Sequence, residues 1–170
     1  MPQVVTIGSG GDYSTVAAWV ASSDFTTDWG AGNPAIGEIT GRLNESVSIK
    51  TTDPVNGAIL RAKSGEEYDG SNSSTCAGLY SSGVTLAVRT DGITLSGIFV
   101  ETTAATVAIQ LGSFESVDTK VLGCGSKSAL NGNSASGIST YHNAPFTGDI
   151  IGFVVEQSGG YGFRLRADCT

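Results

Sequence analysis

Three aspartates, Asp91, Asp118 and Asp149, are the first candidates for chemistry, because each precedes the glycine of a recurring segment. Glycoside hydrolysis needs two carboxyl groups about 5–10 Å apart, and residues one period apart become neighbours in a stacked repeat structure. The three aspartates stand 6, 5 and 3 residues before their glycines. Because they drift out of register, we expect ordinary turn residues here and assign no catalytic residue.

The other ionisable candidates are equally isolated. His142 is the single histidine, and no serine, cysteine or metal partner stands at a fixed spacing from it. Arg164 and Arg166 would share one outward face of a strand, which favours a solvated surface. Neither clustered aspartates for calcium nor histidine with carboxylates for zinc can be found. We therefore expect no metal site and no cofactor.

A glycine-rich stretch, residues 8–11, lies between a predicted strand and a predicted helix. A dinucleotide-binding turn would need glycine where Tyr13 stands, and a nucleoside-triphosphate loop would need Gly-Lys-Ser/Thr before its helix. Neither is present, so the stretch is interpreted as a turn that leads into a cap.

Aromatic residues crowd the last third of the chain and could form a sugar-binding platform. Strand alternation makes Phe153 and Phe163 core candidates and leaves Tyr141, Phe146 and Tyr161 on the surface. We take these last three as candidate contacts for a glycan or a partner protein.

Composition limits the class of protein. The chain has 170 residues and a net charge of −7, and its nine basic residues are scattered, which argues against a nucleic-acid partner. The N-terminus lacks the basic start and apolar run of a signal peptide, so synthesis in the cytosol is expected. No stretch approaches the roughly 18 apolar residues of a membrane span, so no membrane insertion is expected. Cys76, Cys124 and Cys169 fit neither a disulfide framework nor a zinc site.

Two segments recur along the chain and indicate the architecture. The first is centred on Gly97, Gly123 and Gly152, which lie 26 and 29 residues apart. The second, which runs between the copies of the first, aligns on Val84, Val107, Ile138 and Phe163. Two interleaved strand patterns with a period in the twenties predict an all-β fold, a parallel β-helix or solenoid.

The alternation within each copy predicts which side chains point inward. Leu95, Val121 and Ile150 should stack over one another, with Cys124 and Phe153 in the same core. The inward set also includes Ile93, Ile98 and Val100 around Gly97, Val84, Leu86 and Val88 before it, and Ile39, Val47, Ile49 and Ile59 in the first coil.

The N-terminal residues predict a cap for the open end of such a solenoid. Val16, Trp19 and Val20 form one apolar stripe at helical spacing, and Asp12 or Ser14 can cap that helix. We divide the chain into 1–36, an N-terminal strand, capping helix and loop, and 37–170, the coils. Residues 25–34 are predicted to be a loop, and 63–78 a lateral excursion. The last coil looks incomplete at residue 170, so another segment or subunit is expected to cover it.

Residues 6–19 comprise a predicted strand, a Gly-rich turn, the sequence Asp-Tyr-Ser and a predicted helix that contains a tryptophan. This order resembles the N-terminal segment of pectin-lyase-like right-handed parallel β-helix proteins. The helical tryptophan and the segment 41–47 resemble the variant found in bacteriophage virion proteins. The pectin hydrolases' Asp-Asp and Gly-His-Gly motifs are absent. The resemblance implies a virion protein, a capsid decoration, head fibre, tail spike or tail fibre, which is non-enzymatic and binds other virion proteins or a host glycan. It also implies a homo-oligomer such as a trimer. A spike polysaccharide lyase or glycoside hydrolase, and a bacterial surface adhesin, remain the alternatives.

Overall fold

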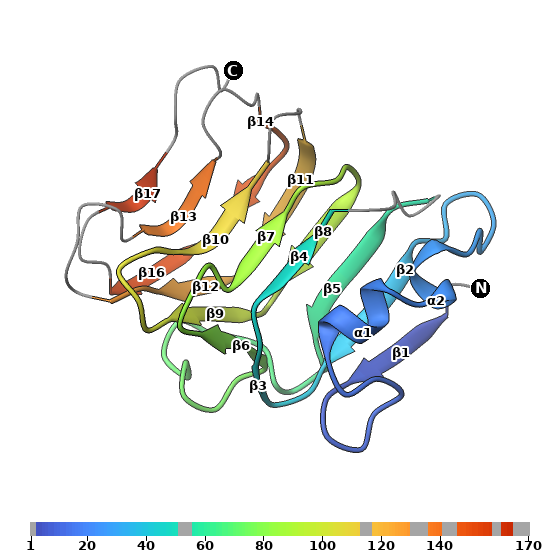
Figure 1. The fold of residues 1–170 in the computed structure, drawn as a ribbon, viewed down its shortest axis with the longest axis horizontal. Coiled ribbons are helices and arrows are strands. Elements are labelled where there is room, and N and C mark those ends of the chain that lie inside the picture. The colour runs from blue at the N-terminus through green and yellow to red at the C-terminus, as the bar shows by residue number, and fades with distance from the viewer. Residues whose placement is uncertain are drawn as a thin grey trace.

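The structure is a computed structural model that describes residues 3–50, 56–112, 117–129, 136–140, 146–157 and 161–164. Within this part of the chain the fold is all-β, with three parallel sheets and two short helices, α1 (Val16–Val20) and α2 (Ser23–Thr26) (Figure 1). None of the helices described is long and apolar enough to cross a membrane.

The strands of each sheet come from successive passes of the chain. Sheet I contains β1 (Val4–Ile7), β2 (Ala35–Ile39), β5 (Ala58–Ala62), β8 (Ile93–Ser96) and β11 (Val117–Leu122), with β14 (Phe146–Thr147) and β15 (Ile150–Ile151) both paired to β11. Sheet II contains β3 (Arg42–Asn44), β6 (Gly78–Ser81), β9 (Phe99–Thr102), β12 (Gly125–Lys127) and β16 (Val154–Gln157). Sheet III contains β4 (Val47–Ile49), β7 (Leu86–Val88), β10 (Val107–Leu111), β13 (Ser136–Thr140) and β17 (Tyr161–Arg164). From β2 onward the chain visits the sheets in the repeating order I, II, III.

The predicted stacking of aliphatic side chains in sheet I is confirmed. Leu60 pairs with Leu95, Leu95 with Val121 and Val121 with Ile150 in one continuous register. Leu95 and Val121 are fully buried in the core between the sheets, and Ile150 packs against it. The predicted bend at Gly97 is also confirmed: its φ of 63° lies in the left-handed region, which a residue without a Cβ adopts at little cost.

Three details of the predicted register are wrong. Ile59 points outward, because the burial of β5 alternates from Ala58 and places Leu60 inside. Ile138 pairs with Ile109 and not with Val107, a shift of two residues that keeps the same face. Phe163, expected in the core, is 44% exposed, because β17 is the last strand of its sheet and no further described strand covers it.

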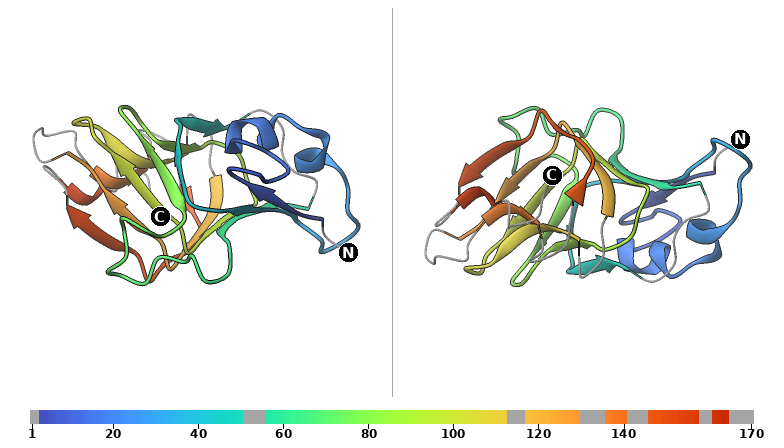
Figure 2. Two further views of the ribbon diagram at one scale, coloured as in Figure 1. Left: turned by 90° about the horizontal axis from the view of Figure 1, so that it is seen from below. Right: turned by 90° about the horizontal axis from the view of Figure 1, so that it is seen from above.

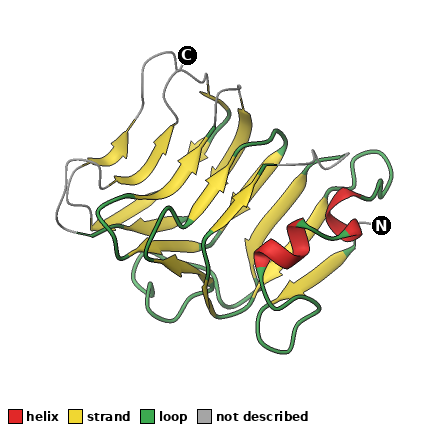
Figure 3. Ribbon diagram, in the orientation of Figure 1, coloured by secondary structure: helices red, strands yellow, loops and turns green. Residues whose placement is uncertain are grey.

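The N-terminal helices lie at one end of the stack and the C-terminal strands at the other, as the views from below and from above show (Figure 2; helices red in Figure 3). Val16, Trp19 and Val20 are all buried, as predicted. The ring of Phe25, which was predicted to lie in a loop, meets Trp19 edge-on at 5.0 Å and is buried. A further short helix, α2, therefore belongs to the cap.

The prediction that Asp12 or Ser14 caps the helix is wrong. Thr15 is the N-cap of α1, and its hydroxyl accepts a hydrogen bond from the Ala18 N–H at 3.1 Å. Asp12 instead accepts hydrogen bonds from the Thr6 backbone N–H at 2.8 Å and the Thr6 hydroxyl at 2.9 Å. Its carboxylate therefore fixes the turn before the helix.

The excursion between β5 and β6 folds back over the outer side of sheet II. Tyr68 and Cys76 from this loop bury Phe99 of β9 in a second, smaller apolar cluster. The Tyr68 hydroxyl donates to Glu156 of β16 at 3.0 Å. The loop thus contacts both β9 and β16, which lie on either side of β12 in sheet II.

Candidate functional site

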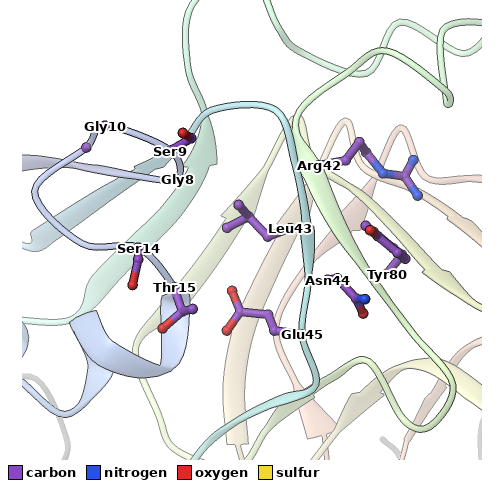
Figure 4. A pocket seen from close by; sticks show the side chains of 11 residues that line it. Gly8, Ser9, Gly10, Ser14, Thr15, Arg42, Leu43, Asn44, Glu45 and Tyr80 are labelled. Carbon is purple, nitrogen blue, oxygen red and sulfur yellow. The ribbon is translucent and has the colours of Figure 1, made fainter.

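A groove with a cavity volume of about 610 Å³ lies at the N-terminal end of sheet II (Figure 4). One wall is the Gly-rich turn together with Ser14 and Thr15 at the start of α1. The other is β3 with Glu45, and Tyr80 of β6 lies beyond it. The stretch interpreted from the sequence as a turn leading into a cap is thus also one wall of the groove.

The groove exists because the first pass of the chain covers only two of the three sheets. β1 pairs with β2 and extends sheet I, and α1 packs against β4 of sheet III. Between them the chain makes the turn of residues 8–12. Among the described strands, β3, the first of sheet II, pairs with β6 alone. The outer edge of β3 therefore faces the groove.

Glu45 supplies a structural cap within the groove. Its two carboxylate oxygens accept hydrogen bonds from the backbone N–H groups of Val16 at 2.8 Å and Ala17 at 3.2 Å. These are N–H groups that a helix leaves unpaired at its first turn. Glu45 is the single carboxylate among the described lining residues, so the groove does not offer the pair of acids that glycoside hydrolysis requires.

Arg42 anchors a row of charges on the outer side of sheet II. Its guanidinium pairs with Glu101 at 2.7 Å, donates to the carbonyl of Ser73 and lies over the rings of Tyr80 and Phe99 at 5.6 and 5.4 Å from their centroids. Lys127 reaches the same Glu101 carboxylate at 3.7 Å. The Arg42–Glu101–Lys127 row therefore links β3, β9 and β12.

Burial and hydrogen bonding shift the pKa values of several side chains. Burial, and then the hydrogen bond to Glu156, raise the pKa of the Tyr68 hydroxyl to about 12. Burial also raises the pKa of the Cys124 thiol to about 11, and the pKa of Cys76 is raised for the same reason. These shifts keep the thiols protonated and poorly nucleophilic near neutral pH. Backbone and side-chain hydrogen bonds from Thr6 lower the pKa of Asp12.

Of the three residues proposed from the sequence as a glycan platform, the side chain of Tyr161 alone lies within the described part of the chain. Tyr161 lies on β17, in the last strand of sheet III, where it is 51% exposed and the Arg164 guanidinium lies 5.2 Å from its ring centroid. The backbone of Phe146 lies in β14, but its side chain is outside the described residues, as is all of Tyr141. His142 also lies outside the described residues.

The three aspartates weighed as a catalytic set include one with a structural use. The Asp91 carboxylate accepts a hydrogen bond from the backbone N–H of Asp118 at 2.8 Å. It therefore fixes the turn of one pass to the strand of the next. Among the described residues no group of three or more side chains could hold a metal ion.

Sequence reasoning missed Arg42, Asn44, Glu45 and Tyr80. Arg42, Asn44 and Glu45 all stood within the quoted segment 41–47. The partners of Arg42 and Glu45 lie 59 and 29 residues away in the chain, however. The one available signal was that β3, like every first strand of a predicted stack, must have an unpaired edge.

Comparison of the chain with protein-family models, with curated proteins and with solved structures finds no match.

Proposed function

We propose that the three sheets are the faces of one right-handed parallel β-helix, and that the chain is a structural, non-enzymatic component of a bacteriophage virion. A capsid decoration or head fibre, or part of a tail spike or fibre, is the specific role. The repeating order I, II, III and the register from Leu60 to Ile150 support the fold part of the proposal. The likeness of residues 6–19 and 41–47 to such proteins supports the virion part.

One observation supports the non-enzymatic part: Glu45 in the groove, and two carboxylates that contact β3 or the residues just before it, are bound to fixed groups of the fold. Glu45 holds the start of α1, Glu101 holds Arg42 and Lys127, and Glu66 accepts from the Thr40 hydroxyl at 2.9 Å and the Gly41 N–H at 2.7 Å. An acid that must donate or accept a proton during catalysis needs access to the substrate. Carboxylates bound in this way hold the cap and the strands of the fold together.

A stack of parallel strands suits a mechanical role. Each strand inside a sheet is hydrogen-bonded on both sides, and the aliphatic ladder buries a continuous core. The last strands carry exposed apolar side chains, among them Ile151 at 60% and Phe163 at 44%. We include in the proposal a homo-oligomer, such as a trimer, and contact with other virion proteins or a host glycan.

Mass spectrometry of density-gradient-purified phage particles tests the proposal. The particles come from cells infected with a phage whose genome carries this sequence. We expect peptides of the chain at a fixed molar ratio to the major capsid protein. Peptides found only in the soluble lysate, with none in the particles, would overturn the virion assignment.

A polysaccharide lyase or glycoside hydrolase is the second candidate, and the Arg42–Glu101–Lys127 row beside the groove is the observation that favours it. Reducing-sugar and unsaturated-sugar release from capsule and cell-wall polysaccharides distinguishes the two roles. The structural role predicts no turnover. Steady release that Glu101→Gln abolishes, while Glu67→Gln retains it, would establish the enzyme.

A further inference from the structure

We propose that the groove beside β3 binds an extended peptide segment of a partner protein, which adds to sheet II as a further strand. This inference goes beyond the proposed function, because it requires only the open strand edge and no virion. The partner is recognised through the N–H and C=O groups of its backbone.

The backbone of β3 presents its unused hydrogen-bonding groups to the groove. The Gly41 carbonyl accepts a hydrogen bond from the Gly78 N–H, and the Glu45 N–H donates to the Tyr80 carbonyl. The backbone groups of Gly41 and Glu45 therefore face β6. Successive residues of a strand direct their N–H and C=O groups to opposite sides. Arg42 and Asn44 therefore direct theirs away from β6, into the groove.

The equivalent edges of the other two sheets are already occupied. β1 fills that place in sheet I, and α1 covers β4 in sheet III. The described residues supply no such strand or helix for sheet II, and the hollow there has the volume of about 610 Å³ given above. A strand placed in this groove would complete the first layer of the stack.

The side chains select the kind of occupant. Leu43 points inward and packs, partly buried, against the main core, so the residue opposite it should be apolar. Arg42 already lies over the ring of Tyr80, which removes that aromatic face as a platform for a sugar. Unpaired N–H and C=O groups along a strand are instead complemented by another backbone.

Fluorescence anisotropy with a labelled synthetic peptide tests the inference. The probe copies residues 77–82, the segment that already pairs with β3 on its other side. We expect saturable binding to the wild-type protein. Binding should be at least ten-fold weaker when the alternate amides of one frame of the peptide are N-methylated, and unchanged when those of the other frame are, because only one set faces β3. Absence of binding, or equal binding of the methylated peptides, would overturn the proposal.

Asn44→Pro removes one groove-facing N–H and leaves the Leu43 bonds to β6, and proline is tolerated on edge strands. It should weaken peptide binding about ten-fold, which corresponds to about 1.4 kcal/mol, a typical value for one hydrogen bond. Ser14→Trp, which fills the groove from the other wall, should do the same without altering β3. Ser23→Trp, on an exposed position outside the groove, is the matched control and should bind like the wild type.

The same measurements distinguish other occupants. Hydrogen exchange should show the amides of Arg42 and Asn44 protected only when peptide is present. Protection of these amides by maltohexaose would assign the groove to a saccharide. Protection that rises with protein concentration alone, together with a dimer in sedimentation, would assign it to a second copy of the chain. Either result would overturn the inference.

Discussion

At the scale of single residues, glycine permits the contact between the excursion loop and sheet II. Gly125 lies beside Phe99 in the register of sheet II. A Cβ at this position would overlap the ring of Tyr68 and lie 2.7 Å from Cδ2 of Phe99. The small cluster of Tyr68, Cys76 and Phe99 therefore depends on a residue that contributes no side chain.

Gly125→Ala should lower the free energy of unfolding by about 1–3 kcal/mol, because overpacking a filled site forces the rings apart. Urea unfolding followed by circular dichroism measures it. Gly83→Ala is the matched control, since a Cβ there meets no atom within 4 Å. Equal stability of the two variants would show that the loop does not pack on β9 as described.

The raised pKa of Tyr68 predicts that the protein loses stability at alkaline pH. The Tyr68 hydroxyl has a pKa of about 12 in the folded protein, above the ordinary value of 10.0. Between pH 10 and 12 this hydroxyl binds fewer protons in the unfolded chain than in the folded one. Its contribution to the free energy of unfolding is therefore fully present below pH 10 and is lost as the pH rises toward 12. The loss should approach about 2 kcal/mol.

Urea midpoints of the wild type and Tyr68→Phe at pH 8, 10 and 11 measure this effect. The phenylalanine variant should start less stable by about 1 kcal/mol, the usual value of a hydrogen bond. It should then lose less stability than the wild type as the pH rises. Parallel declines in the two proteins would contradict the role given to the hydroxyl.

At the scale of elements, the cap is held by a residue from the opposite wall of the groove. α1 has only five residues, and helices this short are not stable alone. Packing of Trp19 on Phe25 and the two hydrogen bonds to Glu45 hold it in place. The corner between β3 and β4 therefore positions the helix that covers β4.

Glu45→Ala should destabilise the protein by about 1–2 kcal/mol, because two backbone N–H groups lose a charged acceptor. Glu45→Gln, which keeps one carbonyl oxygen, should recover part of the loss. Thermal unfolding followed by tryptophan fluorescence reports on both. If the alanine variant melts with the wild type, the cap does not depend on this contact.

The sequence predicted the features that repeat and missed those that occur once. The ladder of Leu95, Val121 and Ile150 followed from period and alternation. Ile59 was placed on the wrong face because Ile59 and Leu60 are both apolar, so alternation alone could not choose the register. The groove escaped prediction because Arg42 and Glu45 pair with residues far along the chain, and no local pattern signals such pairs.

At the scale of the whole molecule, the interior changes character along the stack. In the pass formed by β11–β13, Thr119 stands opposite Ile93 of the pass before, and Ser126 stands opposite Val100. The hydroxyls of Thr119, Ser126, Ser128 and Ser136 are buried without a hydrogen-bond partner among the described residues. Each such group costs about 1–3 kcal/mol.

This pass should consequently open more easily than the aliphatic passes before it. We expect the amides of β11–β13 to exchange with deuterium at least ten-fold faster than those of β5–β10. Hydrogen exchange followed by mass spectrometry resolves the two sets. Uniform protection along the stack would contradict the expectation.

Successive passes of the chain lie directly over one another, and cysteine cross-linking tests this arrangement most directly. Thr94 and Lys120 are paired across β8 and β11, and Ile59 is the partner of Thr94 on the other side. Paired positions lie about 5 Å apart, within reach of a disulfide, whereas positions two strands apart lie about 10 Å apart and beyond it. Under mild oxidation, Thr94→Cys with Lys120→Cys should form a disulfide that mass spectrometry maps, and Ile59→Cys with Lys120→Cys should stay reduced. A bond in the second pair, or none in the first, would contradict the stacked arrangement.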